Sequence, residues 1–159
     1  AVIFARRFWQ NNGKPNKHKI LSQYGCYHGA TFAARSLTNM GAGGLDMGLV
    51  QRVPGFVHVP NYYCYRCMLG HSYPECGLRC VDLLAEVIEH EGADNVAAFI
   101  AEPVLSSGGI LELPPGYLAA LQAHCHERGM LLVRRCTSCL NEAELKITSL
   151  SESLDGELS

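Results

Sequence analysis

An α/β fold with a mostly parallel sheet and flanking helices is predicted by three features of the sequence. The apolar run Val96–Ala101 has the length and flanking residues of a buried strand rather than a helix. A second apolar run, at 130–133, follows a stretch of helical spacing at 117–128. Another helical stretch, at 78–92, precedes the first run, and such alternation of helices and strands is typical of a parallel sheet.

Local patterns place the individual elements. In the helix that begins at Leu78, the apolar residues Val81, Leu84 and Ile88 recur at helical spacing, and Gly92 ends it. The segments before this helix are, in chain order, an amphipathic helix over 1–10, a strand over 17–22, a helix over 30–37, an exposed extended segment over 53–60 and an irregular loop over 61–77.

Composition restricts the class of protein. With 159 residues and 48% hydrophobic content, the chain is long enough for one domain with a core. A net charge of −2 offers no attraction to nucleic acid or to an anionic membrane. No apolar run approaches the roughly 20 residues of a membrane span. The first arginines follow the apolar residues, the reverse of a signal peptide, so we expect a cytoplasmic protein with reduced thiols.

Two segments place polar chemistry after strands. Glu102 ends the run at 96–101 and leads into Ser106-Ser107-Gly108-Gly109, and open α/β sheets bind ligands at the carboxyl ends of their strands. Tyr27-His28-Gly29 offers an aromatic face for a flat cofactor and an imidazole. Spacing alone favours a solvated strand end for the first segment and a structural turn for the second.

Four cysteines, Cys64-x2-Cys67-x8-Cys76-x3-Cys80, suggest a zinc site, with His71 as a further candidate ligand. Free thiols in a loop are the more frequent explanation of such spacing, so no metal is assigned. His124 and His126 point in different directions from one helix and are expected to be solvated. The chain lacks the common hydrolase, nucleotide-binding and zinc-protease motifs.

These segments jointly resemble the class III aminotransferases, which are pyridoxal-phosphate (PLP) enzymes of fold type I. Tyr27-His28-Gly29, the run 95–103, Gly108-Gly109, Pro115-Gly-Tyr117 and the run 129–133 occur in the family's order and spacing. The segment 102–113 is most similar to 2,2-dialkylglycine decarboxylase. The resemblance implies that 1–133 is the central part of a three-layer large domain and that 134–159 is a poorly ordered tail outside the family.

The resemblance also implies roles for single residues. Tyr27 stacks on the pyridine ring of PLP, His28 and Gly29 border the same pocket, and Glu102 lies near the cofactor and the substrate. Ser107 matches the position that contacts the substrate carboxylate in the decarboxylase. The implied reaction moves an amino group from an amino acid to a keto acid such as pyruvate, in a decarboxylation-dependent form if Ser107 acts as in the decarboxylase. The implied assembly is a homodimer.

Several family features have no counterpart in this sequence. The family's phosphate-binding loop is expected before Ala1, and Arg134-Arg135-Cys136 stands where an Asp pairs with the pyridinium nitrogen. A frameshift or an unspliced boundary near Val133 would explain this junction. The segment 141–150 can form a turn or two of helix. The lysines Lys14, Lys17, Lys19 and Lys146 do not match the Schiff-base lysine. An inactive remnant or a Cys-rich zinc-binding module are therefore the alternatives to a transaminase fragment.

Overall fold

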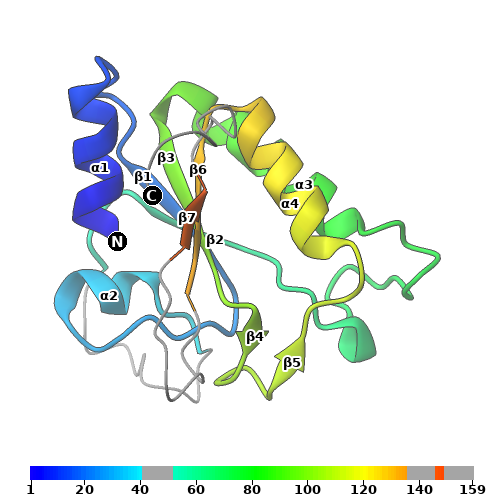
Figure 1. Cartoon of the computed structure of the whole chain (residues 1–159). Helices are drawn as coiled ribbons and strands as arrows, with labels where there is room; N and C mark the ends of the chain where they lie inside the picture. Colours follow the sequence, from blue (N-terminus) through cyan, green and yellow to red (C-terminus); the bar gives the residue numbers. More distant parts are fainter. Residues whose placement is uncertain (41–51, 136–145, 149–159) are drawn as a thin grey trace, which may run out of the picture.

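A computed structural model describes residues 1–40, 52–135 and 146–148. Its centre is a five-stranded sheet with the strand order β2-β1-β3-β6-β7 (Figure 1). The first four strands in this order run parallel, and β7 pairs antiparallel with β6. The strands are β1 (Lys19–Gln23), β2 (Phe56–Val59), β3 (Val96–Ala101), β6 (Leu131–Arg134) and β7 (Lys146–Thr148).

Helices cover both faces of the sheet, so the predicted α/β fold is confirmed (Figure 1). Helix α1 (Val2–Asn11) packs on one face, and the short α2 (Phe32–Leu37) contacts β1 and β2. Helices α3 (Arg79–Glu91) and α4 (Tyr117–Glu127) lie together on the other face. No helix in the described part of the chain is long and apolar enough to cross a membrane.

Strand β3 is the centre of both layers of the core, and all six of its residues are buried. Phe99 and Ala101 pack among the apolar residues of α3 and α4, whereas Ala97 and Ile100 pack against α1 with Trp9. A strand that is covered on both faces needs apolar residues at every position, which explains the uninterrupted apolar run in the sequence.

The segment 53–60 is partly different from its predicted form. Its centre is the edge strand β2, whose register with β1 pairs Ile20 with Phe56 and Gln23 with Val59. Val59 is buried, so the expectation of an exposed segment is wrong at this end. Pro54 and Pro60 flank the strand, where a missing N–H removes no ladder hydrogen bond.

The strand predicted at 130–133 extends past its apolar residues. Strand β6 includes Arg134, and the main-chain N–H of Arg135 still donates to the carbonyl of Ala101 at 2.9 Å. Residues 146–148 form strand β7, so the expected helical turn is wrong there. The open edge of β6 offers main-chain donors and acceptors that an extended segment satisfies. The rest of the predicted tail, at 136–145 and 149–159, lies outside the described residues.

Smaller elements shape the loops around the sheet. Two 3₁₀ turns cover Cys64–Arg66 and Ala93–Asn95. Strands β4 (Val104–Leu105) and β5 (Leu111–Glu112) form a separate two-stranded antiparallel hairpin after β3. This hairpin carries the Ser-Ser-Gly-Gly segment in its turn, near the carboxyl edge of the sheet (Figure 1).

Candidate functional site

The carboxyl edge of the sheet gathers the predicted site residues from three strands. Tyr27 and His28 follow β1, Glu102 follows β3, and Arg135 follows β6. The main-chain N–H of Tyr27 donates a hydrogen bond to the Glu102 carboxylate at 2.7 Å. The structure therefore brings the two polar segments together, because β1 and β3 are neighbouring parallel strands.

Glu102 is fully buried, so a solvated strand end is the wrong interpretation of this residue. A buried carboxylate needs hydrogen-bond partners, and the N–H of Tyr27 is one of them. The hydroxyl of Tyr62 donates to the main-chain carbonyl of Glu102 at 2.9 Å. Tyr62 comes from the irregular loop at 61–77, and sequence reasoning did not single it out.

His28 is 4% exposed, and its main-chain N–H donates to the Thr38 hydroxyl at 3.0 Å. Neither of its ring nitrogens has a hydrogen-bond partner among the described residues. Burial, together with the positive charge of Arg135, lowers the pKa of His28 to about 4. The ring is therefore neutral near pH 7, with one nitrogen able to donate and the other able to accept a hydrogen bond.

Arg135 donates from its guanidinium to the carbonyl of His28. The structure thus puts a positive charge beside the imidazole, at the point of the chain where the resemblance implies an Asp.

One group of three potential metal ligands exists within the described residues: Cys26, His28 and Glu102, whose ligand atoms lie within 4.8 Å of one another. The Cys26 thiol already donates to the carbonyl of Leu37 at 3.1 Å. Burial raises the pKa of Cys26 to about 11, so this thiol is protonated at neutral pH. A protonated, hydrogen-bonded thiol favours a packing role over metal binding.

Glycine is required where the loops after β1 and β3 approach each other. A Cβ atom on Gly108 would lie 3.0 Å from the carbonyl oxygen of Gly25 and 3.4 Å from the Cβ of Leu105. Ser107, the neighbouring residue, is exposed in the hairpin turn and lies outside the buried group around Glu102. Gly29, with φ of 126°, ends the segment that carries Tyr27 and His28.

Lys17 and Lys19 lie away from this site, whereas the backbone of Lys146 in β7 pairs with Arg134 at the carboxyl end of β6. Lys19 begins β1 at the amino edge of the sheet and forms an ion pair with Glu91 at 2.8 Å. Lys17 is buried at the same edge, where its ammonium group donates to the carbonyls of Ala93 at 2.8 Å and Val96 at 3.1 Å. Both lysines are thus separated by the length of a strand from Tyr27 and Glu102.

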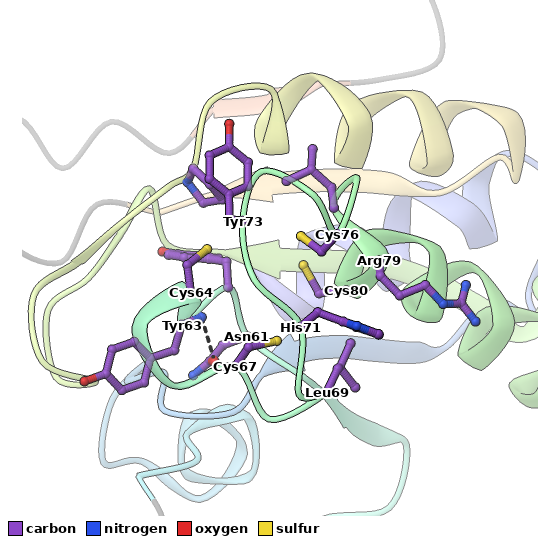
Figure 2. Close-up of a pocket in the computed structure, with 13 residues that line it drawn as sticks. Asn61, Tyr63, Cys64, Cys67, Leu69, His71, Tyr73, Cys76, Arg79 and Cys80 are labelled. Atoms are coloured by element: carbon purple, nitrogen blue, oxygen red, sulfur yellow. Dashed lines mark hydrogen bonds between the residues drawn. The ribbon is translucent and has the colours of Figure 1, made fainter.

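The four loop cysteines line one pocket outside this edge, together with His71 and Tyr62 (Figure 2). All four are free thiols, and no three of them meet the 4.8 Å spacing found for Cys26, His28 and Glu102. On α4, His124 is partly buried and His126 is exposed, so the two rings do not share a site.

Comparison with known proteins identifies the family of this chain. A family model described as aminotransferase class-III matches residues 1–134. The chain belongs to the class III aminotransferase family.

Two relatives of this class III chain are named as aminotransferases. A probable aminotransferase from Mycobacterium tuberculosis is 36% identical over 129 residues, which cover 81% of this chain and 27% of the relative. An aminotransferase from Sinorhizobium fredii is 40% identical over 134 residues, which cover 28% of its length. This chain thus spans less than a third of these relatives.

Solved transaminases have the same fold as this class III chain. An (S)-enantioselective omega-transaminase from Thermomicrobium roseum matches with a TM-score of 0.76 and 37% identity, over 84% of this chain and 30% of that one. An amine transaminase from an uncultivated Pseudomonas species, solved in its PLP-bound form, matches with a TM-score of 0.77 and 30% identity. The predicted fold type I is therefore confirmed.

PLP is the cofactor of class III aminotransferases, and the described residues fit only one wall of its site. Tyr27 offers a half-buried aromatic ring, and His28 offers unpaired ring nitrogens. The guanidinium of Arg135 would repel a protonated pyridine nitrogen bound beside His28, however, and Lys17 and Lys19 lie at the opposite edge. The described residues therefore do not complete a cofactor site.

Proposed function

We propose that this chain is the central part of the large domain of a PLP-dependent transaminase and forms one wall of its cofactor pocket. The observation that carries the proposal is the meeting of the loops after β1 and β3, joined by the 2.7 Å hydrogen bond from Tyr27 to Glu102. Tyr27 would stack on the cofactor ring, with His28 and Gly29 beside it. Glu102 would orient the loop that carries Tyr27.

The proposed reaction of the whole protein is transfer of an amino group from a small amino acid to a keto acid such as pyruvate. Relatives named as gamma-aminobutyrate and diaminobutyrate–2-oxoglutarate transaminases support transfer between small molecules. Ser107 supports a decarboxylation-dependent form, because its exposed side chain can meet a substrate carboxylate from the hairpin turn. A homodimer is supported by the exposed apolar side chains of Ile3 and Phe4 on α1.

A second candidate is a remnant without catalytic activity, and the contact of Arg135 with His28 favours it for the chain by itself. A cation at this position disfavours the protonated pyridine ring on which the cofactor's electron-withdrawing chemistry depends. We infer that the isolated chain fixes no cofactor on a lysine.

The test begins at the genomic locus. The longest reading frame that contains residues 1–133 is expressed and assayed for amino transfer to pyruvate, with Glu102→Gln as the matched variant. We expect activity in a longer protein that contains an Asp in place of Arg135 and a downstream lysine. If no reading frame encodes these residues, the transaminase proposal fails. The second candidate, a remnant without catalytic activity, is then the better account of the chain.

The isolated 159-residue chain provides the complementary measurement. It is incubated with PLP, reduced with borohydride and digested for mass spectrometry. No pyridoxyl-lysine peptide is expected, and its stoichiometric appearance would show that the chain holds the cofactor covalently without the missing parts.

A further inference from the structure

The irregular loop between β2 and α3 brings two pairs of cysteines to one pocket (Figure 2). Cys64 opens the 3₁₀ turn Cys64–Arg66, and Cys67 follows this turn. Cys76 lies in the turn before α3, where its carbonyl accepts from the N–H of Arg79 at 3.1 Å, and Cys80 lies in the first turn of the helix. The two pairs therefore come from opposite ends of the loop, the arrangement by which two-knuckle zinc sites are built.

The four thiols lie within electrostatic reach of one another. Cys80 interacts electrostatically with Cys76, Cys64 and Cys67. Cys64 likewise interacts with Cys76 and Cys67. Thiolates placed together repel one another in the absence of a cation, and a divalent cation between them reverses the sign of this interaction.

We propose that Cys64, Cys67, Cys76 and Cys80 bind one zinc ion in a structural, four-thiolate site. All four cysteines line this one pocket, so their thiols surround a common space. The sulfur atoms lie farther apart than in a closed site, so binding requires rotation of the cysteine side chains toward the pocket centre. Each thiol gives its proton to solvent as it binds.

The consequence for the fold is a restrained loop. The connection at 60–78 is long and contains only one 3₁₀ turn. Ordering a long irregular loop costs conformational entropy, and a metal that joins its two ends reduces this cost. Tyr62 lines the same pocket and donates from its hydroxyl to the carbonyl of Glu102. A zinc ion would therefore also fix the position of Tyr62, whose hydroxyl donates to the main chain of Glu102. This proposal does not rest on transaminase activity.

The test uses the full 159-residue chain, purified under reducing conditions and freed of metal with a chelator. Cobalt(II) is added as a spectroscopic probe, followed by zinc. We expect one cobalt per chain, with sulfur-to-cobalt charge-transfer absorption and the visible bands of a tetrahedral site, and complete displacement by zinc. Absence of the charge-transfer absorption overturns the proposal without the need for any variant.

Variants then assign the ligands. Cys64→Ser and Cys80→Ser should each lose the stoichiometric metal, with circular dichroism to confirm that the chain stays folded. The double variant C136S/C139S and His71→Ala should keep one metal per chain. Loss of the metal in either of these two would overturn the four-thiolate assignment.

Discussion

The N–H of Tyr27 donates to the carboxylate of Glu102 across 75 positions of the chain, at 2.7 Å. This bond joins the loops that follow two neighbouring parallel strands, β1 and β3. It gives Glu102 a structural role in addition to any contact with a cofactor, because the carboxylate sets where the aromatic ring of Tyr27 lies. Variants of this residue can therefore be tested by stability as well as by activity.

Glu102→Ala should destabilise the chain by about 1–3 kcal/mol, because it leaves the N–H of Tyr27 without its acceptor at a buried position. Glu102→Gln keeps an oxygen acceptor of similar shape and should cost less. Urea denaturation of both variants at neutral pH measures the difference. Equal free energies of unfolding for the two variants would show that the hydrogen bond contributes nothing specific.

His28 should make stability depend on pH. Its pKa is lowered from 6.5 to about 4 in the folded chain, so between these values the unfolded chain binds the extra proton. The stability associated with the neutral ring is complete above about pH 6.5 and is lost as the pH falls toward 4. A pKa shift of this size corresponds to about 3 kcal/mol in the free energy of unfolding.

The measurement is the free energy of unfolding from pH 7 to pH 4 for the wild type and for His28→Gln. The variant should lose less stability over this range than the wild type. His126→Gln, which changes an exposed imidazole on α4, is the matched control and should follow the wild type. Parallel curves for all three proteins would contradict the prediction.

Gly108→Ala should destabilise the chain by about 1–3 kcal/mol through overpacking. The added methyl group would lie 3.0 Å from the main-chain oxygen of Gly25, which cannot move without disturbing the loop that carries Tyr27. The neighbouring exposed position supplies the control, since Ser107→Ala should be nearly neutral. Thermal melts of the two variants compare them directly, and a stable Gly108→Ala would show that the two loops separate easily.

Arg135→Asp should strengthen PLP binding by the isolated chain, because it replaces a cation beside His28 with the charge that pairs with a pyridinium nitrogen. One charge-assisted hydrogen bond corresponds to roughly tenfold in affinity. Equilibrium dialysis with PLP measures it. Lys14→Asp makes the same change of charge in the turn after α1 and should have no effect on binding. Equal affinity in all three proteins would remove Arg135 from the cofactor wall.

Much of the fold could be predicted from local patterns. The run 96–101 matches β3 residue for residue, and Val81, Leu84 and Ile88 are all buried on α3. These predictions succeed because a strand covered on both faces requires a continuous apolar run and an amphipathic helix requires apolar residues at helical spacing. The contact of Tyr27 with Glu102 was not predicted, because it depends on β1 and β3 being neighbours in the sheet.

Other features depend on long-range contacts, which produce no recognisable pattern in the local sequence. Strand β2 acquires its form by pairing with β1, and β7 forms where the edge of β6 offers free main-chain groups. The main-chain carbonyl of Glu102 accepts a hydrogen bond from Tyr62, which comes from a loop without periodicity. Neighbours far apart in sequence cannot be identified from either segment alone.

The sequence by itself determined the α/β class, the central strand and the candidate residues after it. The hydrophobic period and the order of helices and strands along the chain are both visible in the sequence. Only the tertiary structure decided how these residues are held. It buried Glu102 beneath the N–H of Tyr27, left the ring of His28 neutral beside Arg135, and set four loop thiols around one pocket. Burial and electrostatic reach are properties of the packed chain, so they required the fold.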